Sequence, residues 1–256
     1  MVLTEMYKWF INNNLSLNTS KTFYMPFGKK QTLSQLIPIC LTNISITPTP
    51  TVEAAAEVRF LGVTLDHNLN WNAHIDKLKS RLGSAIFALK YIRKRIGPDA
   101  AKIAYHAYFH SLIDYGLPFW GVNKRINEIF TLQKKALRAT LNIKCQRVTC
   151  REKFKTNNIL TIIGSFIMNT CVLLHKNIDS YPKHIHQHNT RHKENLMIPR
   201  IKENSYTYMG VKLYNSLPND LKQLELKHFK TKIKEMAMDI EPYSIQEFIE
   251  NIKQCT

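Results

Sequence analysis

The sequence predicts an α+β fold in which a small antiparallel sheet is followed by a helical bundle and a mainly helical C-terminal region. Runs of β-branched and aromatic residues bounded by Gly, Pro or Asn lie between residues 21 and 65, which is typical of short strands. From Trp71 onward, apolar residues recur every three or four positions, which is typical of amphipathic helices. The 256 residues suffice for one large domain or two small ones.

The first elements are predicted to be one helix and a few strands. Apolar residues recur at helical spacing within 1–13, before a run of three Asn residues. Strands are expected at 21–27 and 58–65, and the segment 42–50 alternates apolar and polar residues before its prolines. Together these segments predict an antiparallel sheet spanning 21–65.

Three amphipathic helices are predicted next. The first runs from Trp71 to a stop at Gly97, and the second begins at Pro98 and ends near Leu112. The third covers 124–141. The spacing directs these residues inward: Trp71, Ile75, Leu78, Leu82, Ala85, Leu89, Ile92, Ile126, Ile129, Phe130, Leu137 and Leu141. A polar, His-rich loop is expected over 180–208, and a final helical segment is expected to begin near Leu217.

The charge of the chain is strongly basic and unevenly distributed. There are 36 Lys and Arg residues against 19 Asp and Glu, a formal net charge of +17 and a pI near 9.7. Residues 67–155 hold 18 of the basic residues and only five of the acidic ones. A domain this basic usually binds a polyanion, so nucleic acid is the expected partner.

Cysteine usage and hydropathy bear on the compartment. The five cysteines are odd in number and irregularly spaced, which does not form a disulfide framework. The sequence from Met1 lacks the pattern of a signal peptide, and no stretch reaches the ~18 apolar residues of a transmembrane helix. We therefore expect an intracellular protein with no membrane partner, and the sequence leaves its oligomeric state and its location in nucleus or cytoplasm open.

Familiar catalytic and metal-binding motifs are mostly absent. Asp66 begins a segment that resembles a calcium loop, but Trp71 and Lys77 stand where glycine and glutamate are required. A cluster of histidines is either a solvated loop, which we favour, or part of a zinc site completed by a cysteine or another histidine. No metal site is therefore predicted. The residues concerned are His184, His186, His188 and His192, with Cys145, Cys150, Cys171 or His175.

Several strings, taken in order, resemble the end of the reverse-transcriptase domain of jockey-like non-LTR retrotransposons. The resemblance covers nearly the whole chain, and the order and spacing of the strings make it specific. The strings are LSLNTSKT (15–22), FLGVTLD (60–66), WNAHI (71–75), FHSLIDYGLPFWG (109–121), LQKKALR (132–138), HNTR (188–191) and MGVKLYNSLPNDLK (209–222).

This resemblance implies roles for two early sites. Lys21 matches the lysine of polymerase motif D, which acts near the triphosphate of the incoming nucleotide; its other reading is a solvated lysine at the start of a strand. Phe60, Leu61 and Gly62 match the motif E hairpin that grips the primer, and they also suit a core strand in which Gly62 marks a bulge.

The resemblance also implies a domain order. Residues 1–66 would be the end of the palm, 67–145 a helical thumb, and 146–256 a C-terminal region containing the His-rich loop. The outward cations of the thumb would hold RNA, DNA or an RNA–DNA hybrid through phosphate contacts. These are Lys79, Arg81, Lys90, Arg93, Lys94, Arg95, Lys134, Lys135 and Arg138.

The sequence departs from a working polymerase in its carboxylates. The complete family enzyme holds Mg²⁺ with aspartates, including an Asp-Asp pair, whereas this chain has no such pair and its first aspartate is Asp66. We therefore expect a truncated RNA-directed DNA polymerase that begins past the catalytic loop and is inactive alone, with no cofactor of its own. The alternative is a non-catalytic basic nucleic-acid-binding protein, in one version a zinc-assisted RNA binder.

Overall fold

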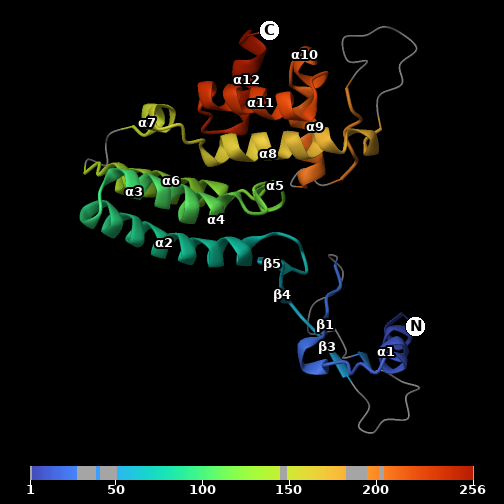
Figure 1. Cartoon of the computed structure of the whole chain (residues 1–256). Coiled ribbons are helices and arrows are strands. Elements are labelled where there is room, and N and C mark those ends of the chain that lie inside the picture. The colour runs from blue at the N-terminus through green and yellow to red at the C-terminus, as the bar shows by residue number, and fades with distance from the viewer. Residues whose placement is uncertain are drawn as a thin grey trace, which may run out of the picture. The chain divides into compact units, whose positions relative to one another are not determined.

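The computed structural model describes residues 2–27, 39–40, 51–144, 149–182, 195–201 and 205–255. The chain divides into two compact units, Met1–His74 and Ile75–Thr256. Strands lie in the first unit and helices make up the second (Figure 1), so the predicted α+β class is confirmed. The predicted strand segment 42–50 and the four clustered histidines lie outside the described residues.

The first unit contains one helix packed beside a three-stranded sheet. The strand order is β1-β3-β2, and β3 runs antiparallel to β2 but parallel to β1, so this sheet is mixed. Tyr7 and Val52 form its small core among the described residues, whereas Met6 and Trp9, which share the predicted apolar spacing, are exposed. The elements are α1 (Val2–Asn12), η1 (Thr19–Lys21), β1 (Phe23–Tyr24), β2 (Ile39–Cys40) and β3 (Thr51–Ala54).

The segment predicted as one strand over 58–65 is instead a hairpin of β4 (Glu57–Phe60) and β5 (Val63–Asp66). Phe60 pairs with Val63, and both intervening residues have positive φ, 45° for Leu61 and 87° for Gly62, as a type I′ turn requires. Gly62 therefore lies in the turn and not at a bulge within a strand. The reading of Phe60 and Leu61 as core residues is wrong, because they are 56% and 73% exposed.

The carboxylate of Asp66, the last residue of β5, has a structural role. The carboxylate of Asp66 accepts hydrogen bonds from the backbone N–H groups of Asn68, Asn70 and Trp71 at 3.0 to 3.2 Å. Those bonds hold the loop that leads into α2 (Asn72–Arg95). Asp66 is thus a loop-closing residue.

The second unit is a layered helical bundle. Figure 1 shows α2 followed by a layer of α3 to α6, then α8, then α9 to α12. Helix α8 is buried along most of its length and contacts α5, α6, α9 and α11. Beyond α2 the helices are α3 (Pro98–Ala104), the π-helical turn η3 (Tyr105–His110), α4 (Ser111–Asp114), α5 (Leu117–Trp120), α6 (Ile126–Leu141), α7 (Arg151–Thr156), α8 (Ile162–Lys176), η4 (Ile178–Ser180), α9 (Tyr206–Asn215), α10 (Asn219–Lys222), α11 (Leu226–Ile240) and α12 (Ile245–Cys255).

The predicted inward faces of α2 and α6 are largely confirmed. Ile75, Leu82, Ala85 and Leu89 are fully buried, as is Leu137. Each such leucine stabilises the fold by roughly 1.5–3 kcal/mol relative to an exposed one. None of the helices within the described part of the chain is both long enough and apolar enough to cross a bilayer.

The other helix boundaries differ from the prediction in two places. The helix predicted over 98–112 consists of α3, the π-helical turn η3 and α4. Gly97 (φ 131°) separates it from α2 as expected. The final helical segment starts earlier than Leu217, because α9 begins at Tyr206, where the hydroxyl of Ser205 accepts a hydrogen bond from the backbone N–H of Tyr208.

Candidate nucleic-acid interface

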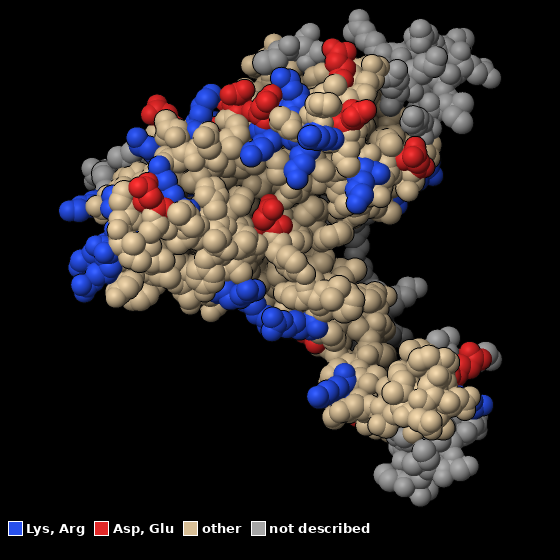
Figure 2. Space-filling model, viewed as in Figure 1, with Lys and Arg blue, Asp and Glu red and all other residues tan. Residues whose placement is uncertain are grey.

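A groove of about 1050 Å³ lies where the C-terminal halves of α2 and α6 meet. Figure 2 shows Lys and Arg side chains gathered at the end of this unit where α2 stops. Six of the predicted nucleic-acid-binding residues line it: Lys90, Arg93, Lys94, Lys134, Lys135 and Arg138. The remaining lining residues are Ile86, Thr131, Ala139, Asn142, Ile143 and Lys144.

Helical spacing explains why these side chains converge. Lys90 and Lys94 are four residues apart on α2, and Lys134 and Arg138 are four apart on α6, so each pair lies on one helix face. The adjacent face of each helix is apolar and buried in the bundle, for example at Leu89 of α2 and Leu137 of α6. Burial of those faces therefore turns the two basic faces toward a shared groove.

The lining of the groove carries a high positive charge. Seven cations line it, and no Asp or Glu occurs among its lining residues. Arg138 aside, six lysines and arginines line the groove. None of these six forms an ion pair with a carboxylate within the described ranges. The two helix C-termini that end nearby contribute only about half a negative charge each. A bound anion would therefore meet a strong positive potential.

One guanidinium in the groove has an unmet hydrogen-bonding group. The Nε of Arg93 is buried and has no hydrogen-bond partner among the described residues. A buried N–H without an acceptor is unfavourable by about 1–3 kcal/mol. A phosphate entering the groove would offset the positive charge of this guanidinium.

Aromatic rings fix the position of Lys134. Its Nζ lies 4.5 Å from the ring centroid of Phe130 and 5.6 Å from that of Tyr243. The guanidinium of Arg151 lies 4.3 Å from the same Tyr243 ring and forms an ion pair of 2.6 Å with Glu247 of α12. The C-terminal helix thus supports one wall of the groove.

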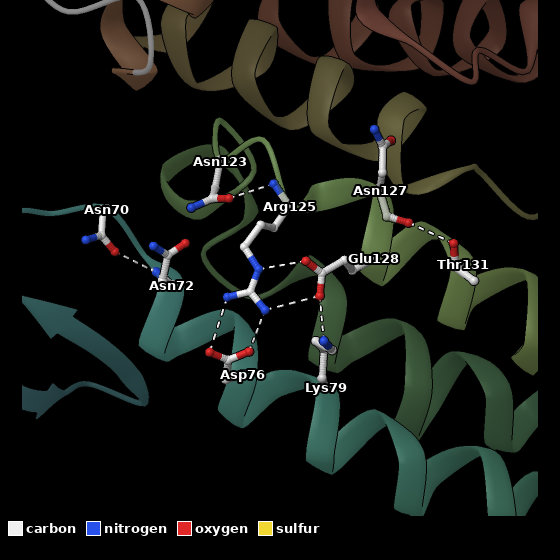
Figure 3. A network of polar contacts seen from close by, with 9 residues as sticks. All are labelled: Asn70, Asn72, Asp76, Lys79, Asn123, Arg125, Asn127, Glu128 and Thr131. Carbon is white, nitrogen blue, oxygen red and sulfur yellow. Dashed lines mark hydrogen bonds and ion pairs between the residues drawn. The ribbon is translucent and has the colours of Figure 1, made fainter.

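A separate ion network joins the N-terminal part of α6 to α2 (Figure 3). Arg125 donates to Glu128 at 2.7 Å and to Asp76 at 2.6 Å, and Lys79 pairs with Glu128 at 2.5 Å. Hydrogen bonds from Arg125 and Lys79 lower the pKa of Glu128 to about 2. Lys79, one of the predicted phosphate-binding residues, therefore lies outside the groove and is neutralised within the protein.

This network predicts a pH-dependent contribution to stability. Arg125→Gln should lower the thermal midpoint at pH 7, because Asp76 loses its guanidinium partner and Glu128 keeps only Lys79. A carboxylate with a lowered pKa stabilises the fold above its unfolded pKa and ceases to do so as it is protonated. The difference between wild type and variant should therefore shrink as the pH falls from about 4.5 toward 2. Thermal melts across this range test it, and a constant difference would contradict it.

The other predicted residues are not among those that line the groove. Lys21 is exposed at the end of η1, two residues before β1. Phe60, Leu61 and Gly62 form the exposed tip of the β4–β5 hairpin. In the second unit, Arg81 and Arg95 are exposed on α2 but do not line the groove.

Sequence reasoning missed two features of this region. Lys144, three residues after the end of α6, is the seventh cation that lines the groove. Its position in a basic segment of the sequence could have indicated this role. Arg125, the residue before α6, is the centre of the ion network. Its partner Asp76 lies 49 residues away in sequence, so no local pattern indicates the pair.

The described residues do not match the requirements of a catalytic magnesium site. No group of three or more His, Cys, Asp or Glu side chains within the described ranges could hold a metal ion. Asp66 uses its carboxylate to close a backbone loop. Cys150 and Cys171 are free and buried, and burial raises the pKa of the Cys171 thiol to about 12.

The sequence was also compared with known proteins. Over 142 residues, 54% of this chain, it is 25% identical to "Probable RNA-directed DNA polymerase from transposon BS" of Drosophila melanogaster. The chain spans 15% of the length of that relative. No family model and no solved structure matches it. The similarity supports a relationship between this chain and reverse transcriptases of mobile elements.

Proposed function

We propose that this chain is the nucleic-acid-holding part of an RNA-directed DNA polymerase from a jockey-like non-LTR retrotransposon. The observation that carries the proposal is the groove between α2 and α6, where seven cations gather without a carboxylate among the lining residues. The similarity to a transposon polymerase supports the same conclusion. RNA, DNA or an RNA–DNA hybrid would bind by phosphate contacts, which position a strand without reading its sequence.

The lining of the groove argues against a small-molecule site. Pockets for small ligands are mostly apolar with a few polar groups. Here most lining side chains are cationic, and Ile86 and Ile143 are the large apolar ones. A polyanion that spans several lysines and arginines matches this surface better than a compact metabolite.

We extend the proposal to the domain order. Residues 1–66 are assigned to the end of a palm, 67–145 to a thumb and 146–256 to a C-terminal region. In the complete polymerase, Lys21 would offset charge near the triphosphate and the Phe60–Gly62 turn would lie against the primer. The exposure of Lys21 and of the hairpin tip is compatible with these roles. In that enzyme Mg²⁺ would be held by carboxylates outside this chain.

The second candidate function is a stand-alone basic binding protein without chemistry. The same groove favours it, together with the lack of a carboxylate cluster among the described residues. A transcript that encodes an Asp-Asp pair upstream of and in frame with Met1 would favour the polymerase. Primer extension by the purified chain with Mg²⁺ would contradict the proposal that it is inactive alone.

Binding itself is the first test of the proposed function. Fluorescence anisotropy should give similar affinities for unrelated sequences of equal length, because phosphate contacts carry no sequence information. The affinity should fall steeply with salt, as counterion release requires. An affinity that hardly changes between low and high salt, or that depends strongly on sequence, would contradict phosphate contacts as the basis of binding.

A further inference from the structure

Two aromatic side chains of α2, next to the lysines of the groove, are largely exposed to solvent. Phe87 is 75% exposed and Tyr91 is 59% exposed, although both lie in a helix whose other face is buried. They are four residues apart, so they lie on one face of the helix with about 6 Å between their positions along its axis. A bound partner that covered these rings would remove apolar area from water, which is favourable.

The position of the rings relative to the groove is set by the helix. Lys90 and Lys94 line the groove, and each lies three residues after one of the rings, Phe87 or Tyr91 respectively. Residues three apart are neighbours on a helix surface, so the two rings lie next to the groove-lining lysines, although they do not line the groove themselves. The guanidinium of Arg95 lies 5.9 Å from the ring centroid of Tyr91, which adds a further cation beside the rings.

We propose that Phe87 and Tyr91 stack on unpaired bases, so that the groove holds a nucleic acid that has a single-stranded extension. In a duplex each base face is covered by its neighbours, and only an unpaired base can offer its face to an aromatic ring. Stacking of this kind tolerates any sequence, because every base has a π face. The adjacent cations supply the charge complementarity that selects a nucleic acid over an apolar partner.

This proposal rests on the proposed function and is tested separately from it. Three probes are compared by fluorescence anisotropy: a blunt duplex, the same duplex with a single-stranded extension, and that duplex with an abasic extension of equal length. The wild-type chain should bind the extended duplex more tightly than the abasic one, although both carry the same phosphates. The preference should be about tenfold for each stacked base.

Variants assign the preference to the rings. Phe87→Ala with Tyr91→Ala should abolish the preference for the extended duplex and leave blunt-duplex binding within about twofold, because no phosphate contact is lost. Phe87→Trp with Tyr91→Phe should keep it. Tyr108→Ala removes a different exposed ring, 47% exposed on η3, and serves as the matched control.

The outcomes separate the two proposals. Equal binding of the extended and abasic probes, or an equal loss on all three probes in the double alanine variant, overturns stacking while salt-dependent binding still supports the proposed function. A chain that binds none of the three probes contradicts the proposed function itself. Circular dichroism of each variant establishes that it is folded before its binding is interpreted.

Discussion

Replacing Lys90, Lys94 and Lys135 together with Gln is expected to weaken nucleic-acid binding and to flatten its salt dependence. The three ammonium groups line the groove on both helices and are exposed. Each phosphate contact contributes about 0.9 to the slope of the logarithm of affinity against the logarithm of salt concentration. The slope should therefore decrease by about 3, and the affinity should fall alike for unrelated sequences.

A matched variant controls for the loss of net charge. Lys227, Lys230 and Lys253 are also exposed, but they lie on α11 and α12 and do not line the groove. Their replacement with Gln removes the same three charges and should leave the slope nearly unchanged. Anisotropy titrations at several salt concentrations compare the two variants. Equal changes in both would mean that net charge, and not the groove, governs binding.

Gln133→Leu is expected to cost the fold about 3 kcal/mol or more of unfolding free energy. Gln133 is fully buried in α6, where its Nε2 donates to the carbonyl of Leu160 at 2.9 Å and its Oε1 accepts from the N–H of Ile162 at 2.7 Å. Leucine leaves both backbone groups buried without their partner, at about 1–3 kcal/mol each. The Tyr105 hydroxyl loses a contact as well.

Urea unfolding followed by circular dichroism measures this effect. Asn127→Leu is the matched control, because it makes the same kind of change at an exposed position of the same helix. Its free energy of unfolding should change by no more than about 0.5 kcal/mol. A loss below about 1 kcal/mol in Gln133→Leu would show that other groups or water replace the side chain. In that case the Gln133 side chain would not be what holds α6 beside the segment that starts α8.

Much of the second unit could be predicted from the sequence, because an amphipathic helix records its buried face in its spacing. The inward residues of α2 and α6 follow that rule, from Ile75 to Leu89 and from Ile126 to Leu137. Helix α8 was not singled out. It is apolar on nearly every side, as a helix enclosed by other helices must be, and so has no polar face to define a period.

The first unit was harder to predict because its pairing is set by contacts distant in sequence and by one turn. The parallel pairing of β1 with β3 joins Phe23 to Glu53 and has no local signature. The resemblance implied a hairpin at Phe60–Gly62, but strand propensity alone gave one strand over 58–65, because the turn begins with Leu61 and a leucine at positive φ is rare. The dipeptide Leu61-Gly62 contains only half of the usual signal for such a turn.

The sequence indicated which residues belong to the candidate interface but not where they meet in the folded chain. Basic residues at helical spacing indicated which faces of α2 and α6 would be cationic. Their convergence into one groove, and the diversion of Lys79 into an ion pair with Glu128, depend on how the helices pack. The exposed rings of Phe87 and Tyr91 also emerged only from the structure, since their spacing alone does not distinguish a packed face from an exposed one.

Lysine footprinting of the complex tests the central claim most directly. The chain is acetylated with and without a bound RNA–DNA hybrid, and the modified lysines are quantified by mass spectrometry. If the groove holds the nucleic acid, Lys90, Lys94, Lys134, Lys135 and Lys144 are protected on binding, whereas Lys227, Lys230 and Lys253 are modified as in the free chain. Protection confined to the lysines of α11 and α12, with the groove lysines unchanged, would contradict the account.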